Sequence, residues 1–182
     1  MNDIELMDEI IEEIKGVVSK VNNESLDAAI NMISKKNKIF IDGEGRSGLM
    51  AKGFAMRLMH LGYNVYVVGE TITPKLSTGD LFIVVSGSGK SINVISDTER
   101  AKQIGCNILA FTSDIKSKLA LLSDLIVMVP GTTKEIQGRE RKSIQLLSSL
   151  FDQSIHIVLD YICLCLSRRD NFTNESATKN HW

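Results

Sequence analysis

The chain opens with apolar residues at the spacing of a helix. The first helix is predicted from five positions that share one face: Ile4, Met7, Ile11, Ile14 and Val18. A second, shorter helix is expected from Ser25 to Lys35, with Asp27 in its first turn, where a negative charge is favourable. Residues 1–36 are therefore predicted to form a helical N-terminal segment.

From residue 37 the pattern changes to short, continuous apolar runs rich in β-branched residues. Five runs are predicted strands, each buried on both faces: residues 38–41, 64–68, 81–85, 107–111 and 125–129. Amphipathic stretches alternate with most of these strands, which favours parallel pairing. We expect a single α/β domain of the flavodoxin-like kind, a doubly wound, five-stranded parallel sheet flanked by helices, with its core in residues 37–166.

The end of the chain is predicted to hold one long helix. Residues 144–166 are apolar enough to suggest a membrane span, but Asp152, His156 and Asp160 interrupt them at helical spacing. Because a charge in the middle of a bilayer is costly, a buried helix is the better interpretation. The polar residues 130–142 are expected to form a loop before it, and residues 167–182 a polar C-terminal tail.

Composition narrows the classes of function. The 182 residues are 43% hydrophobic and 24% charged, with a net charge of −1, which gives no strong attraction to nucleic acid or to an anionic membrane. The three cysteines form no CxxC pair and have no histidine at metal-ligand spacing, so we expect no metal site. The acidic, periodic N-terminus resembles no targeting peptide, and we expect a cytoplasmic protein with a small-molecule ligand.

Two glycine-rich loops each follow a predicted strand and precede a helix. In SGSGKS (residues 86–91), a nucleotide-binding P-loop would need glycine at position 84, where the chain has Val84. In GEGRSG (residues 43–48), the glycines fit the GxGxxG pattern of dinucleotide sites, and Glu70 follows at the distance of a ribose-binding acid. A nicotinamide-dependent oxidoreductase is therefore one hypothesis, although it leaves SGSGKS unexplained.

A monophosphate site explains both loops. Helix N-termini offer free backbone N–H groups, and short hydroxyl side chains add donors that do not crowd one phosphate. We predict that the phosphate is held by Ser47, Ser86, Ser88 and Ser91, and that the substrate also contacts Gly45, Arg46, Glu70, Gly87 and Gly89. The alternatives are that the serines and glycines only form turns and caps, and that Arg46 pairs with Asp42.

Longer motifs resemble a known family. GEGRSGLMAKGFAMRLMHLG, VGETITP and SGSGKS, in that order, resemble the sugar isomerase (SIS) domain, and within it the 6-phospho-3-hexuloisomerases. The resemblance runs through nearly the whole chain. It implies interconversion of 3-hexulose 6-phosphate and fructose 6-phosphate in the ribulose monophosphate pathway of formaldehyde assimilation. It also implies that no cofactor is needed and that the protein is a homo-oligomer, usually a tetramer.

The resemblance also implies the catalytic residues. The family's base is a glutamate in SLFEQ, and this chain has Asp152 in SLFDQ. His60 lies within the family motif, and His181 matches a C-terminal histidine of the family. Because the aspartate is one methylene shorter, the second hypothesis is a SIS-type sugar-phosphate-binding protein with little or no catalysis. The apolar faces of the first and last helices favour a subunit interface, with a tetramer favoured and a dimer left open.

Overall fold

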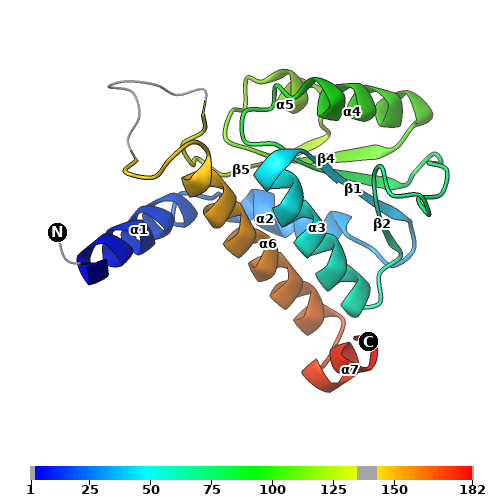
Figure 1. Ribbon diagram of the computed structural model, residues 1–182. Coiled ribbons are helices and arrows are strands. Elements are labelled where there is room, and N and C mark those ends of the chain that lie inside the picture. The colour runs from blue at the N-terminus through cyan, green and yellow to red at the C-terminus, as the bar shows by residue number, and fades with distance from the viewer. Residues whose placement is uncertain (1–2, 135–142, 182) are drawn as a thin grey trace.

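The computed structural model describes residues 3–134 and 143–181, in which helices cover both faces of a five-stranded parallel sheet (Figure 1). The elements follow in this order: α1 (Asp3–Val18), α2 (Asn23–Met32), β1 (Ile39–Gly43), α3 (Gly45–His60), β2 (Val65–Val67), β3 (Leu81–Val85), α4 (Ile92–Ile104), β4 (Asn107–Thr112), α5 (Lys118–Leu122), β5 (Leu125–Met128), α6 (Ser149–Arg169) and α7 (Asn174–Lys179). The predicted α/β fold with five parallel strands is confirmed.

The strand order places both glycine loops at one point of the sheet. The order is β2-β1-β3-β4-β5, so the chain moves from β1 to one edge and then returns to add β3 on the other side of β1. Gly43 at the end of β1 pairs with Val85 at the end of β3. This is the topological switch point, where ligands of such sheets bind.

Burial follows the position of each strand in the sheet. All five residues of β3, at the centre, are buried. The prediction of burial on both faces is wrong for β2, whose three residues are only half-buried, because β2 is an edge strand with a neighbour on one side alone. The same holds for most of β5, at the opposite edge.

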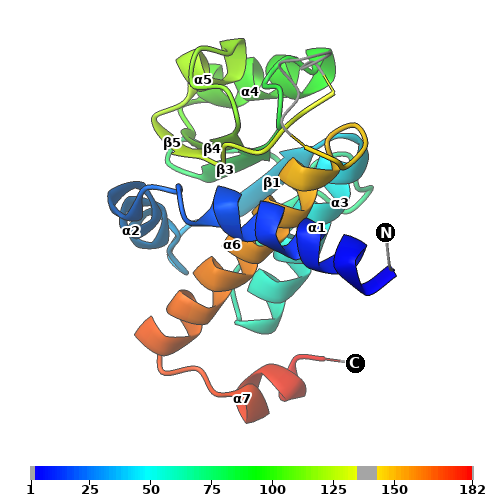
Figure 2. The same ribbon diagram turned by 90° about the vertical axis from the view of Figure 1, so that its left-hand side faces the viewer.

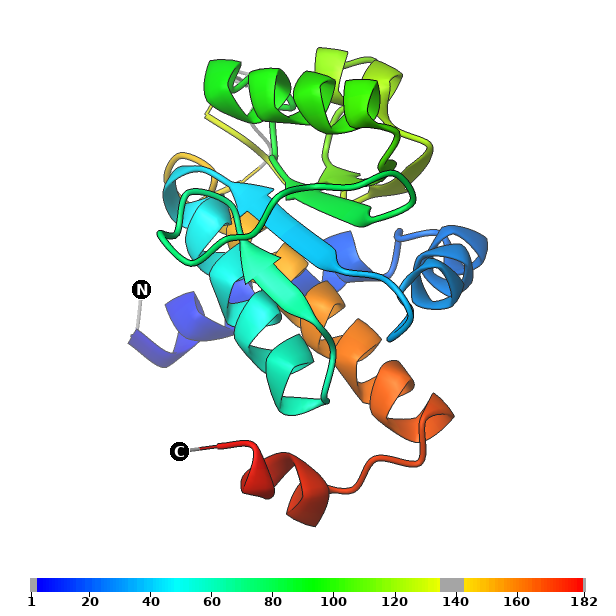
Figure 3. The ribbon, with the colours of Figure 1, turned by 90° about the vertical axis from the view of Figure 1, so that its right-hand side faces the viewer.

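Two helical layers enclose the sheet. Helices α4 and α5 cover one face, while α3, α6, α1 and α2 lie on the other (Figures 1 and 3). Turning the molecule shows α1 crossing α6 near its N-terminal end (Figure 2). This arrangement brings the start of α6 close to the starts of α3 and α4.

The last long helix begins later than its apolar pattern predicts. It starts at Ser149 rather than at residue 144, because Glu13 of α1 holds the segment before it in a non-helical form. Its carboxylate accepts hydrogen bonds from Ser143 Oγ (2.9 Å), the Ile144 amide (2.9 Å) and Gln145 Nε2 (3.1 Å). Leu147 then adopts a φ of +51°, which is incompatible with a right-handed helix.

Helix α6 is long and apolar enough to cross a membrane by length and composition, but 56% of its most apolar window is buried in the fold. It also runs beyond the predicted residue 166, because Arg169 anchors its end. The guanidinium donates to the carbonyls of Ile30 (2.6 Å) and Ile33 (3.0 Å) and to the hydroxyl of Tyr63 (2.7 Å). Part of the predicted tail then forms α7, and Asn180, directly after it, donates from Nδ2 to the His60 carbonyl at 2.9 Å.

Candidate active site

A cavity of about 590 Å³ opens at the topological switch point. Three segments that are far apart in the sequence line it: the start of α3, the loop from β3 to α4, and the start of α6, with Lys134 beside them. The structure brings together these predicted site residues: Gly45, Arg46, Ser47, Ser86, Gly87, Ser88, Ser91 and Asp152. The sheet therefore gathers most of the predicted phosphate loops and the predicted base around one space.

The glycines of the first loop are required by close packing of α3 on β1. A Cβ at Gly48 would overlap the carbonyl oxygen of Gly43, and a Cβ at Gly43 would lie 2.9 Å from the carbonyl oxygen of Val85. Packing of α3 against β1, together with the close approach of β3 to Gly43, thus accounts for these two members of the GxGxxG pattern. A dinucleotide is not needed to explain them.

Three helices point uncapped N-termini at the cavity. The residues at their N-cap positions are Glu44, Ser91 and Ser148, and none of these side chains caps its own helix. In contrast, Asn22, Ser117 and Thr173 do cap α2, α5 and α7. Since a capping side chain would consume a free N–H group, the difference leaves donors available at the cavity for an anion. Ser91 thus occupies the N-cap position of α4, but its side chain makes no capping hydrogen bond.

Asp152 is the buried acid of the cavity. It lies in the first turn of α6, its exposed fraction is 2%, and its Oδ1 accepts a hydrogen bond from Ser47 Oγ at 2.7 Å. Burial raises the pKa of Asp152, whereas the Ser47 hydrogen bond and the charge of Arg46 oppose that rise. The carboxyl is thus moved from its ordinary range toward the range of a general base.

Arg46 is held beside this carboxyl by a neighbour on α6. Its Nη1 donates to Ser149 Oγ at 2.8 Å, and this bond, not a pair with Asp42, fixes the side chain. The guanidinium thus remains at the cavity wall, where a phosphate would meet a fixed positive charge.

Two predicted substrate contacts lie outside the cavity. Gly89 has a φ of +61° and closes the loop against α5, where its carbonyl accepts the Leu119 amide at 3.3 Å. Glu70 is exposed and forms an ion pair with Lys52 Nζ at 3.2 Å. Neither residue lines the space around Asp152.

His60 and His181 lie together at the other end of α3. Their rings stack with centroids 5.1 Å apart, and His60 is about 20 Å along the helix from Ser47. Burial lowers the pKa of His60, and the nearby charges of His181 and Arg57 lower it further. Within one chain, these histidines do not meet Asp152.

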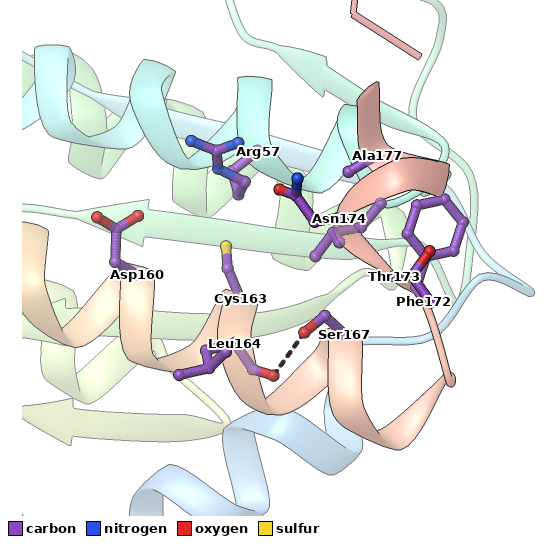
Figure 4. A pocket seen from close by; sticks show the side chains of 10 residues that line it. Arg57, Asp160, Cys163, Leu164, Ser167, Phe172, Thr173, Asn174 and Ala177 are labelled. Carbon is purple, nitrogen blue, oxygen red and sulfur yellow. Dashed lines mark hydrogen bonds between the residues drawn. The ribbon is translucent and has the colours of Figure 1, made fainter. Parts of the chain in front are cut away.

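A second cavity, of about 370 Å³, lies between α3, α6 and α7 (Figure 4). Arg57 and Asp160 flank it, and Cys163 lines its floor. Burial raises the pKa of this thiol to about 12, so the sulfur is protonated and unreactive at neutral pH. None of the predicted site residues lines this cavity, whereas eight of them line the first, which is therefore the candidate active site.

Five residues of the active-site cavity were not predicted: Glu44, Lys134, Leu147, Ser148 and Ser149. Ser148 and Ser149 lie four and three positions before Asp152. A search for hydroxyl side chains at the start of the last helix could therefore have found them. The sequence around Lys134 does not indicate a site residue, because Lys134 is brought to the cavity by a distant contact: its amide donates to Ser148 Oγ at 3.2 Å. The rest of the predicted loop, residues 135–142, lies outside the described residues.

Known proteins are similar to this chain in sequence. The model of the SIS domain matches residues 32–157, which include all three segments of the cavity. The 3-hexulose-6-phosphate isomerase of Bacillus subtilis is 37% identical over 181 residues, covering 100% of this chain and 98% of that protein. The chain belongs to the SIS domain family. A second SIS relative, the 3-hexulose-6-phosphate isomerase of Mycobacterium gastri, is 39% identical over 151 residues, covering 83% of this chain and 75% of that protein.

A solved structure superposes on nearly the whole chain. This protein, from Methanococcus jannaschii, has been inferred from its structure to be a 3-hexulose-6-phosphate isomerase. The TM-score is 0.84, the identity 34%, and the superposition covers 98% of each chain. The likeness therefore includes α1 and α7, which lie outside the residues that the SIS model matches.

Proposed function

We propose that this chain is a phosphosugar isomerase that interconverts 3-hexulose 6-phosphate and fructose 6-phosphate. The observation that carries the proposal is a buried carboxyl, Asp152, in the same cavity as three uncapped helix N-termini. The names of the relatives with 37% and 39% identity supply the substrate class. No step of the reaction requires a cofactor.

The phosphate is proposed to bind at the start of α4. Ser86, Ser88 and Ser91 line one wall of the cavity there, and the N-terminus of α4 adds backbone donors and a partial positive charge. Arg46 and Ser47 line the same space from α3, and Ser47 is proposed to add a further hydroxyl donor to the phosphate. A dianionic phosphate would thus meet donors and charge from two helices.

The isomerisation needs one base that moves a proton between adjacent carbons. Asp152 removes the proton from C2 of the 3-ketose, which gives a cis-enediolate across C2 and C3, and returns it to C3. The O2 hydroxyl loses its proton as the C2 carbonyl forms, and O3 gains one, so the product is the 2-ketose without any change in redox state. Donors at the helix N-termini stabilise the negative charge that develops on the oxygens.

His60 and His181 enter this proposal through a second copy of the chain. Within one chain they lie at the far end of α3 from the cavity, so they can act at a cavity only in a neighbouring subunit; His181 is the exposed member of the pair and His60 is buried beside it. We therefore propose a homo-oligomer, with a tetramer favoured, in which these histidines transfer protons between the substrate oxygens.

The test is turnover of fructose 6-phosphate in deuterated water. We expect deuterium at C3 of recovered fructose 6-phosphate and formation of the 3-ketose, and we expect Asp152→Asn to lower kcat by about 10²-fold or more. Thermal unfolding of the variant is the control for folding. Absence of both exchange and product in the unchanged protein would refute the isomerase.

One alternative has a specific observation in its favour. Asp152 stands where the resemblance implies a longer glutamate, and its carboxylate is already engaged by Ser47. A sugar-phosphate-binding protein without catalysis would bind fructose 6-phosphate but show no exchange. Asp152→Glu separates the two ideas, since a gain in rate means that the reach of the carboxylate limits catalysis, and no activity in either form means binding alone.

A further inference from the structure

Ser47 stands between two acceptors. Its hydroxyl lines the same cavity as the phosphate that is proposed to bind at the start of α4, but in the structure it donates to Asp152 Oδ1 at 2.7 Å. A serine hydroxyl carries a single proton, so it can donate to one acceptor at a time. The phosphate and the catalytic carboxylate therefore compete for one hydrogen bond.

We infer that Ser47 is a positioning residue that exchanges its hydrogen bond when substrate binds: it donates to Asp152 in the free protein and to the substrate phosphate in the complex. The inference rests on the isomerase proposed above. In this role the serine changes the pKa of the catalytic base, which a residue that only binds phosphate would not do.

The exchange would couple binding to basicity. A donor to a carboxylate stabilises the anion, which lowers its pKa and weakens it as a base. When the hydroxyl turns to the phosphate, the carboxylate loses that donor while it remains buried, and the incoming dianion raises its proton affinity further. Asp152 thus becomes a stronger base only when a substrate is present to be deprotonated.

The length of the aspartate makes this exchange a property of this chain. Its Oδ1 reaches Ser47 from the first turn of α6, and one more methylene would carry the carboxyl about 1 Å farther along the side chain. Arg46, fixed by Ser149, keeps its charge beside both acceptors throughout. The moving part is therefore one hydroxyl rotor.

The experiment measures the pKa of Asp152 directly, by NMR of carboxyl-¹³C aspartate, with Asp152→Asn used to assign the signal. It compares the unchanged protein with Ser47→Ala and Ser47→Thr, each free and saturated with fructose 6-phosphate. We expect Ser47→Ala to raise the pKa of the free protein by about one unit and to leave that of the complex unchanged. Ser47→Thr, which keeps a hydroxyl, should restore the lower value.

Ser88→Ala is the matched control, because it removes a cavity hydroxyl from the phosphate wall and leaves the bond to Asp152 in place. It should weaken sugar-phosphate binding without changing the pKa of free Asp152. If Ser47→Ala shifts the pKa of Asp152 equally in the free protein and in the complex, the hydroxyl never leaves Asp152. If it shifts the pKa in neither, the hydroxyl has no influence on the carboxyl. Either result overturns the exchange. The NMR measurement needs no turnover. A protein that is inactive but shows the expected changes in the pKa of Asp152 would therefore refute the isomerase and support the exchange of the Ser47 hydrogen bond. Failure to bind fructose 6-phosphate would overturn both.

Discussion

Asp42 lies at the end of β1, directly before the first glycine loop, and its exposed fraction is 9%. Its Oδ1 accepts the Gly43 amide at 2.8 Å, but its Oδ2 has no hydrogen-bond partner among the described residues. Burial, with smaller contributions from the charges of Asp97 and Glu44, raises the pKa of Asp42 to about 6, although the Gly43 hydrogen bond opposes the rise. A charged Asp42 therefore destabilises the native state at neutral pH.

This carboxyl should give the protein a measurable pH dependence. Because the native pKa exceeds the unfolded one, the native state binds the proton more tightly, and the free energy of unfolding falls as the pH rises from about 4 to about 6. The free energy of unfolding, measured with urea, should differ between pH 4.5 and pH 7.5, and Asp42→Asn should remove about 2 kcal/mol of that difference. Asp8→Asn, on exposed α1, is the control for loss of a carboxylate. An unchanged difference would contradict the assignment.

Leu147 has the left-handed backbone conformation that β-carbons disfavour, with a φ of +51°, and its side chain is 69% exposed. This strain lies in the cavity wall, one residue before the N-cap of α6. Leu147→Gly should raise the free energy of unfolding by about 1 kcal/mol, because glycine adopts this conformation without the steric penalty. Leu147→Ala keeps the penalty, so equal stability of the two variants would show that strain is not the cause.

At the scale of elements, α1 holds the entry to the active-site helix. Glu13 accepts three hydrogen bonds from residues 143–145, which lead into α6 and Asp152. Glu13→Ala should lower the free energy of unfolding by about 1–3 kcal/mol and reduce kcat/KM, since the start of α6 loses its anchor. The neighbouring Glu12 pairs only with exposed Lys15 among these contacts, at 3.3 Å, so Glu12→Ala should change stability by less than about 0.5 kcal/mol. Equal effects of the two variants would contradict this role.

The elements that the sequence predicts well are those set by local pattern. The five apolar runs place all five strands within one or two residues, although the edge strand β2 is less buried than predicted. The predicted start of α6 was too early because Ile144 and Leu147 continue the apolar pattern of the helix. The backbone conformation there is set instead by Glu13, which accepts a hydrogen bond from the Ile144 amide although the two residues are 131 positions apart. The serine loops were predictable from composition at helix starts. The Ser47 bond to Asp152 spans 105 residues and has no local signal.

At the scale of the whole molecule, several helices leave apolar side chains exposed, α1 and α6 among them. On α1 these are Ile4, Met7 and Ile11, and on α6 they are Ile157, Tyr161 and Leu164. The free half of α1 projects from the body of the fold (Figure 1). Two separate apolar surfaces favour two kinds of contact between copies, which is the geometry of a tetramer rather than of a single two-fold dimer.

Light scattering after size-exclusion chromatography should therefore give a mass of about 80 kDa, four times the 20.1 kDa of one chain. Leu164→Glu places a charge on the exposed face of α6 and should split the assembly into smaller units with an unchanged far-UV spectrum. Leu121→Glu, at an equally apolar and more exposed position on α5 across the sheet, should leave the mass unchanged. If the histidines of a neighbour complete the active site, the split form of Leu164→Glu will bind fructose 6-phosphate but lose turnover. A monomeric, fully active protein would refute the shared site and leave Asp152 to act with the residues of its own chain.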